Sequence, residues 1–322
     1  MSNNHQDRPQ QKRIVKFIPT DEQRQMEIRE WKEVTPELSA LLQRLDDKSA
    51  ANAFIEKYGK KLQRLPPPKS QLLLLPETLR IKDLKNVDRF VYKYVYARKK
   101  YRVRKNQASL TRTEWLRFKG TINALRESGI EPPTYQEFVD IHVQAMTTPE
   151  GHMWGAHGGS NFLPWHREYL VELENRMRLF NPLVTIPYWD WANDPLPAEL
   201  SDPQDLADWE ITRNDPVGPM PSQIQVNNVM AETTWDGFRT SLEGIHNLVH
   251  VSVGGQMATA SSPSDPIFWL HHAVIDKIWA DWQKLNPTKK PTNLSEQLQP
   301  PPVFQRTVGQ VMSTASIGYV YV

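Results

Sequence analysis

The sequence predicts a mainly α-helical fold with long loops, preceded by a helical N-terminal extension. Three observations lead to this prediction. Apolar residues recur at helical spacing in five long segments after Thr111. The 26 prolines indicate long irregular connections between those segments. The chain has 322 residues, of which 39% are hydrophobic, so it can bury a substantial core.

Charge and composition change sign near residue 100, where we place a domain boundary. Residues 51–104 hold fifteen Lys and Arg against four Asp and Glu, whereas residues 105–322 hold fifteen against twenty-four. We therefore predict a basic, mostly helical extension over 1–99 and a separate domain over 100–322. The basic residues alternate with Leu, Val and Tyr, which favours packing of the extension on the acidic domain over binding of nucleic acid or lipid.

Composition excludes several classes of protein. No run of about 18 apolar residues occurs, so we expect neither a membrane span nor a membrane partner. The N-terminal sequence MSNNHQDRPQQKR has no apolar core of a secretory signal, so the expected location is the cytoplasm, with export by a partner protein as the open alternative. Because the chain has no cysteine, a metal site must use histidine or carboxylate ligands.

The expected domain contains five helices in order along the chain. The first closes with a glycine, the second carries His142, the third is entered by Pro164, and the last two are strongly apolar on their buried faces. Residues 192–235 are rich in Pro, Asp and Asn and are predicted to be loop, while IGYVYV is predicted to be a strand. The five segments are TRTEWLRFKGTINALRESG, TYQEFVDIHVQAM, HREYLVELENRMRLF, GFRTSLEGIHNLVHVSV and DPIFWLHHAVIDKIWADWQKL.

The nine histidines are distributed unevenly. His5 stands alone near the N-terminus. The other eight form two clusters, His142, His152, His157 and His166, then His246, His250, His271 and His272.

His246 and His250 are the strongest candidate pair of metal ligands, since a separation of four places two side chains on one helix face about 6 Å apart. Alone this spacing is weak evidence, and a third ligand must come from elsewhere. His271 and His272 begin the next helix, and neighbouring residues cannot face the same way on a helix. Asp276 follows His272 by four residues, and we expect its carboxylate to orient that imidazole.

The first cluster can supply a second set of three imidazole ligands. His142 comes from a helix, His157 from the glycine-rich stretch GAHGGSNF, and His166 from the start of the next helix. Glycine permits the tight backbone conformations that such a loop needs. Three neutral imidazoles without a carboxylate suit copper or zinc better than magnesium or calcium. Two such sets favour copper redox chemistry with dioxygen over two-metal hydrolysis.

The motifs together resemble the tyrosinase/catechol oxidase family of type 3 copper proteins. They are GAHGGSNFLPWHREYL, PYWDW, HNLVH, GGQM and DPIFWLHHAVIDKIWADW, in that order, and the resemblance covers about residues 100–322. It implies a four-helix bundle that holds two copper ions, each bound by three histidines. The implied ligands of the first copper are His142, His157 and His166, and those of the second are His246, His250 and His272.

The resemblance also assigns other residues. His271 is the implied non-ligand neighbour, and Phe268 resembles the ring that packs on the third ligand of the second copper. Glu243 and Asn247 resemble a pair that holds a water near the second copper and accepts the phenol proton through it. Val251 and Ala260 lie at the implied substrate entrance, where a small residue at 260 suggests an open site.

The activity that the resemblance implies is oxidation of phenols by O2. Monophenols would be hydroxylated at the ortho position, and o-diphenols would be oxidised to o-quinones. Three alternatives stay open: a catechol or o-aminophenol oxidase without hydroxylase activity, an O2 carrier resembling haemocyanin, and a structural zinc protein. A homo-oligomer and a copper-delivery partner are also open, whereas no nucleic-acid partner is expected.

Overall fold

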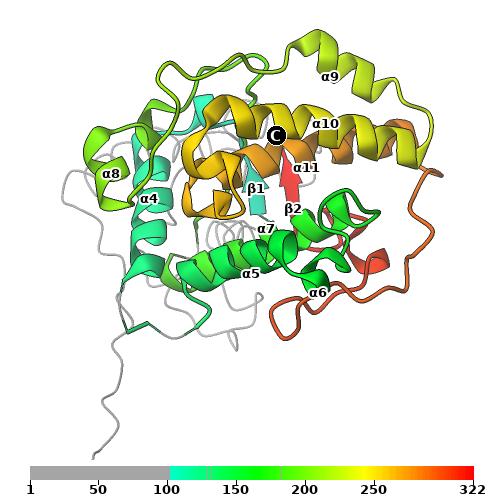
Figure 1. The fold of residues 1–322 in the computed structure, drawn as a ribbon, viewed down its shortest axis with the longest axis horizontal. Helices are drawn as coiled ribbons and strands as arrows, with labels where there is room; N and C mark the ends of the chain where they lie inside the picture. The colour runs from blue at the N-terminus through cyan, green and yellow to red at the C-terminus, as the bar shows by residue number, and fades with distance from the viewer. Residues whose placement is uncertain (1–101, 128, 131, 182) are drawn as a thin grey trace, which may run out of the picture.

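The mainly α-helical prediction is confirmed in the computed structural model, which describes residues 102–127, 129–130, 132–181 and 183–322. The predicted extension over 1–99 lies outside the described residues. Figure 1 shows the helices stacked around one another, with α5 and α10 on one face. The helices are α4 (Arg112–Arg126), α5 (Tyr135–Thr147), α6 (Pro149–His152), α7 (Phe162–Phe180), α8 (Pro203–Asp208), α9 (Gln223–Met230), α10 (Trp235–Val253) and α11 (Ile267–Leu285).

Helices α4, α5 and α10 begin where the sequence provides side-chain caps. At Thr111 and at Thr134 the side-chain oxygen accepts the N–H of a glutamate three residues later, and that glutamate returns the bond. Such reciprocal capping satisfies backbone donors that a helix start leaves without partners. Thr234 caps α10 through the N–H of Gly237. The caps at Thr134 and Thr234 fix where α5 and α10 begin, and these two helices carry His142, His246 and His250.

The central helix is α7, which contacts α4, α10 and α11. Its residues Trp165 and Tyr169 are fully buried, and they pack against Trp269 of α11 and Phe304 of the C-terminal segment. Burial of large aromatic side chains contributes about 2–3 kcal/mol each. The aromatic layer therefore fixes α7 and α11 relative to one another, and both helices carry histidines.

Two details of the predicted helices are wrong. The expected loop over 192–235 contains α8 and α9, because Asp202 caps α8 ahead of a proline and Ser222 forms a capping box with Gln225. Helix α7 begins at Phe162, two residues before the expected start at Pro164, because proline fits the first turn of a helix. The domain also contains short 3-10 turns at Gln107–Ser109, Ala198–Leu200, Gly255–Ala258, Ser262–Ser264 and Gly309–Val311.

The predicted C-terminal strand is confirmed as β2 (Tyr319–Tyr321), which pairs in parallel with β1 (Arg102–Arg104). The register places Arg102 opposite Tyr319 and Arg104 opposite Tyr321. The guanidinium of Arg104 lies 3.8 Å from the ring centroid of Tyr319. This contact joins the first and last described segments of the domain.

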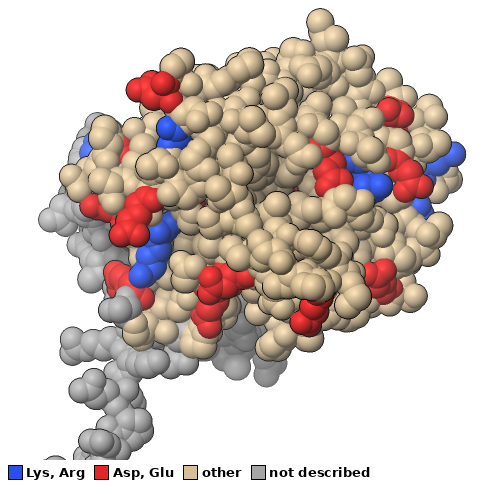
Figure 2. All heavy atoms as spheres, in the orientation of Figure 1, with Lys and Arg blue, Asp and Glu red and all other residues tan. Residues whose placement is uncertain are grey.

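None of the described helices is both long enough and apolar enough to cross a membrane. Figure 2 shows that the middle of the face over α5 and α10 carries few charged side chains, which gather toward its edges. This face is the one from which the histidine-bearing helices α5 and α10 are seen.

Candidate metal centre

Helix α10 presents one face of polar side chains toward the interior. Residues at positions i, i+3, i+4 and i+7 lie on one side of a helix, and here they are Glu243, His246, Asn247 and His250. The first two are buried, His250 is half-buried and Asn247 is exposed. The face thus runs from the core to the surface.

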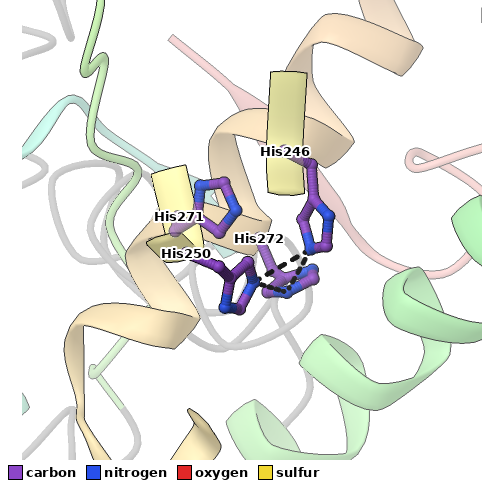
Figure 3. Close-up of side chains that lie close together, drawn as sticks. All are labelled: His246, His250, His271 and His272. Atoms are coloured by element: carbon purple, nitrogen blue, oxygen red, sulfur yellow. Dashed lines mark hydrogen bonds between the residues drawn. The ribbon is translucent and has the colours of Figure 1, made fainter. Parts of the chain in front are cut away.

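Three imidazoles of α10 and α11 converge on one point. The Nε2 atoms of His246 and His250 lie 3.0 Å apart, and Nε2 of His272 lies 3.2 Å and 3.4 Å from them. Figure 3 shows the dashed triangle that joins these three rings. His271 offers a fourth nitrogen within 4.8 Å of the others but lies outside the triangle.

The other nitrogens of two of these rings are held by oxygen acceptors. His246 donates its Nδ1–H to Oδ1 of Asn247 at 3.0 Å, and His250 donates its Nδ1–H to the carbonyl of Met257 at 2.6 Å. A neutral imidazole with its proton on Nδ1 carries a lone pair on Nε2. Two lone pairs therefore face one another at 3.0 Å, an arrangement that a cation between them would stabilise.

Two imidazoles of the first cluster are also held by hydrogen bonds from Nδ1 to a carbonyl oxygen. His142 on α5 donates its Nδ1–H to the carbonyl of Ala260 at 2.7 Å, and His166 on α7 donates its Nδ1–H to Phe162 at 2.8 Å. Their Nε2 atoms are buried and have no hydrogen-bond partner among the described residues. His157 completes a set whose ligand atoms lie within 4.8 Å of one another, whereas His152 is exposed and bonds to Met146.

The two clusters lie side by side. The rings of His166 and His272 stack with centroids 4.2 Å apart and an interplanar angle of 10°. Phe162 packs edge-on against both His166 and His246, at 5.2 Å and 4.9 Å between centroids. One small molecule between the clusters could therefore contact both.

Burial keeps the six imidazoles neutral. It lowers the pKa of His250 to about 4, and together with the neighbouring histidines it lowers the pKa of His157 to about 4. Burial is also the first cause of the lowered pKa at the four innermost rings, His142, His166, His246 and His272. Neutral imidazole is the form that binds a metal ion.

Known proteins share both the sequence and the fold. A family model described as the common central domain of tyrosinase matches residues 132–220 and 210–285. The tyrosinase of Streptomyces glaucescens is 37% identical in an alignment 234 residues long, and the match covers 58% of this chain and 84% of that protein.

The chain belongs to the tyrosinase family. It is a tyrosinase-type oxidoreductase with a binuclear copper site. Two solved structures show the same fold. An octopus haemocyanin functional unit has a TM-score of 0.58 and 24% identity, covering 68% of this chain and 67% of its own. Latent apple tyrosinase has a TM-score of 0.56 and 20% identity, covering 69% and 63%.

The histidine geometry of this tyrosinase-family chain fits copper. Metal–nitrogen bonds of about 2.0–2.1 Å at a tetrahedral angle place neighbouring nitrogens about 3.3 Å apart. The measured separations of 3.0–3.4 Å in the second cluster are close to that value. Imidazole donors held by second hydrogen bonds are typical of metal ligands, and a donor set without carboxylate suits copper.

Glu243 connects the two halves of the tyrosinase site. Its Oε1 accepts the backbone N–H of Gly158 at 2.6 Å, and its Oε2 accepts Nη1 of Arg239 at 3.2 Å. Burial raises the pKa of this carboxyl, while the two donors oppose that change. Gly158 has a positive φ of 65°, which glycine adopts readily, so the glycines flanking His157 shape this loop.

The residues predicted for the entrance lie beside the histidines. The side chain of Val251 follows His250 and is 64% exposed, while Ala260 is half-buried and holds His142 through its carbonyl. Phe268 packs on His272, with centroids 4.1 Å apart, and on His142 at 5.1 Å. The ring of Phe268 therefore contacts both clusters, although the resemblance implied only the second.

The prediction for Asp276 is wrong. Its Oδ1 accepts Nε of Arg167 at 2.5 Å, and its Oδ2 accepts the hydroxyls of Tyr319 and Tyr321, each at 2.5 Å. Nδ1 of His272 has no hydrogen-bond partner among the described residues. A spacing of four predicts proximity along a helix, but α7 and the C-terminal strand supply stronger donors on the side that Asp276 faces.

Sequence reasoning missed the backbone acceptors. The carbonyls of Phe162, Met257 and Ala260 hold three of the imidazoles, and no side-chain pattern reports a carbonyl that accepts from a distant residue. It also missed Trp191, whose indole contacts His271. A signal for Trp191 existed, because it belongs to the motif PYWDW, but its partner could be found only in three dimensions.

Proposed function

We propose that the protein hydroxylates monophenols at the ortho position and oxidises o-diphenols to o-quinones with O2. The observation that carries this proposal is the pair of three-histidine clusters, joined by the stacked rings of His166 and His272. Two ions held there would be close enough to act on one oxygen molecule. The 37% identity to a bacterial tyrosinase supports the same reaction.

The proposed metal ligands are His142, His157 and His166 for one ion and His246, His250 and His272 for the other. Copper bound there would supply the electron transfer to O2 that amino-acid side chains cannot provide. The protein's part is to present six neutral imidazoles in fixed directions. Carbonyl and amide acceptors behind four of the rings, together with burial, provide that orientation.

We propose that Glu243 and Asn247 handle the proton of a monophenol. They lie one turn apart on α10, on either side of His246. A carboxylate whose pKa is raised by burial is a better proton acceptor near neutral pH than an exposed one. Asn247 accepts from His246 through Oδ1, which leaves its amide N–H groups to bind a water or the phenol oxygen.

The entrance proposed for phenols passes Val251 and Ala260. An aromatic substrate would pack there against exposed aliphatic surface on its way to His250, which is half-buried. Both side chains are small enough to admit substituted rings. The weakly charged face in Figure 2 suits a neutral aromatic substrate.

We also propose a copper-delivery partner. Four of the six rings, His142, His166, His246 and His272, are at most 2% exposed, so free copper reaches the centre past His157 or His250. A partner that docks over these two histidines would bring copper to the accessible edge. Slower loading of the isolated chain than of the chain with its partner would support this proposal.

The experiment is to load the protein with Cu(II) and to follow quinone absorbance with tyrosine and with catechol. The proposal expects quinone from both substrates. Turnover of catechol alone would establish the diphenol oxidase instead. Reversible O2 binding without quinone would establish a carrier, and two zinc ions without copper in the isolated protein would establish a structural metal site.

A further inference from the structure

Trp191 makes one hydrogen bond that defines the chemical state of a buried histidine. Its indole Nε1–H donates to Nδ1 of His271 at 3.1 Å. Both side chains are buried, at 3% and 0% exposure. An indole nitrogen is only a donor, so Nδ1 of His271 must provide a lone pair. The ring is therefore neutral and carries its proton on Nε2.

This histidine lies where a fourth ligand could bind. The ring of His271 stacks on His246 with centroids 4.9 Å apart and an angle of 20°, and it lies 4.9 Å from the ring of His250. All four histidines of the second cluster offer a nitrogen within 4.8 Å of the others. Figure 3 shows His271 next to the triangle and separate from it. Judged by position alone, a small shift of His271 would therefore give a metal site with four imidazole ligands.

A fourth ligand would close the site. Metal sites with four protein ligands are typically structural, whereas catalytic sites keep three protein ligands and one open position. A nitrogen that carries a proton has no lone pair for a metal ion. The hydrogen bond from Trp191 uses the lone pair on Nδ1 and leaves the proton on Nε2, so neither nitrogen of His271 is free to coordinate.

We infer that Trp191 is a positioning residue that fixes His271 as the Nε2–H tautomer. In this tautomer His271 cannot bind the second metal ion, which therefore has only three protein ligands. The inference rests on the proposed function, because the open position is where O2 and phenol would bind. It explains why two adjacent histidines occur on α11 while one completes the triangle. His272 contributes to the trio, and His271 fills the space beside it as a neutral, hydrogen-bonded ring.

The first experiment reads the tautomer in the metal-free protein by two-bond proton–nitrogen correlation NMR. The wild type is expected to show His271 with its proton on Nε2. In W191F the donor is absent, so a mixture of tautomers is expected. W189F is the matched control, since Trp189 is a buried tryptophan of the same motif that donates to Asp194 instead. A proton on Nδ1 of His271 in the wild type would overturn the inference.

The second experiment measures zinc affinity of the metal-free variants by competition with a chromophoric chelator. H271Q keeps an oxygen acceptor for Trp191 and is expected to bind two zinc ions with affinities within threefold of the wild type. W191F is expected to bind the second ion about tenfold more tightly, and W191F/H271Q to return to the wild-type value. This rescue separates coordination by His271 from a general loss of packing.

The outcomes remain decisive if W191F does not fold. A tenfold loss of zinc affinity in H271Q would show that His271 is a ligand and would overturn the inference. Where W191F does fold, a W191F/H271Q variant that binds zinc like W191F would also overturn the inference. Because these measurements use zinc and metal-free protein, an absence of phenol oxidation would count against the proposed function and leave this inference standing.

Discussion

The backbone N–H of Gly158 donates to the carboxylate of Glu243 at 2.6 Å. Gly158 follows His157 in the loop of the first cluster, whereas Glu243 precedes His246 on the helix of the second. The bond therefore ties the loop of one proposed metal ligand, His157, to the helix that carries two proposed ligands of the other ion. Arg239 supports the same carboxylate from one turn earlier on α10.

Substitutions of Glu243 should separate its two roles. E243A removes the carboxylate that accepts the partly buried hydrogen bond from Gly158, which costs about 1 kcal/mol, and should loosen His157. E243Q keeps an oxygen acceptor but removes the carboxylate. We expect E243A to lose one copper ion to a chelator faster than the wild type.

E243Q is the matched variant in that experiment. It should retain both copper ions and should oxidise catechol, while its hydroxylation of monophenols falls about tenfold or more because the proton acceptor is lost. Copper retention by E243A equal to that of the wild type would show that the bond to Gly158 does not hold the first cluster together.

The metal-free protein should lose stability as the pH falls below about 6.5. Burial lowers the pKa of the clustered histidines in the folded state, to about 4 for His157 and His250. Between those values the unfolded chain binds more protons than the folded chain, so the free energy of unfolding falls as pH decreases from 6.5 toward 4. Each buried imidazole contributes about 1 kcal/mol of this loss at pH 5.5.

Urea unfolding at pH 7.5, 6.5 and 5.5 measures this dependence. H250Q should reduce the slope with pH, because it removes one buried imidazole whose pKa is lowered in the folded state. A free energy of unfolding that stays constant from pH 7.5 to 5.5 would contradict the burial of neutral rings.

The helices of the domain could be predicted from sequence because their signals are local. Thr111 and Thr134 mark helix starts through capping boxes that are visible as letters, and the apolar spacing of α10 and α11 is long and regular. Helices α8 and α9 were missed because they are short and lie among prolines. In such segments a cap such as Asp202 or Ser222 outweighs weak helical periodicity.

The histidines of the site could be predicted because a shared ion constrains their spacing. Two ligands on one helix face must lie three or four residues apart, so the separation of His246 and His250 can be recognised in the sequence. The direction of Asp276 could not be predicted in the same way. Its partners, Arg167 and the two C-terminal tyrosines, come from elements 43 to 109 residues away along the chain. Such contacts depend on packing that no local pattern encodes.

Asp276 should matter for stability more than for the metal centre. It is 3% exposed and accepts from Arg167, Tyr319 and Tyr321, with Arg104 at 3.5 Å. D276A would leave the buried guanidinium of Arg167 without its counter-charge, which costs about 3–5 kcal/mol, whereas Arg104 keeps Glu174 at 3.3 Å.

The measurement for Asp276 combines urea unfolding with zinc affinity. Y319F, which removes one hydroxyl donor and keeps the ring over Arg104, should cost about 1 kcal/mol. Among molecules that remain folded, both variants should bind two zinc ions as tightly as the wild type. A selective loss of zinc from the second cluster in D276A would restore the view that this carboxylate orients His272.

The side chain at position 260 should control which phenols reach the site. Ala260 is half-buried, and its carbonyl, not its side chain, holds His142 at 2.7 Å. A260F therefore keeps that hydrogen bond while it adds a ring at the proposed entrance. We expect KM for bulky phenols to rise about tenfold, equivalent to about 1.4 kcal/mol, with little change in kcat for catechol.

A258F provides the control for A260F, because Ala258 is exposed in the preceding 3-10 turn, two residues away. It should leave KM unchanged for bulky and small phenols alike. Copper content should equal that of the wild type in both variants, since neither changes an imidazole or its acceptor. An equal rise of KM for catechol and for bulky phenols in A260F would indicate a displaced loop, because a steric gate discriminates by substrate size.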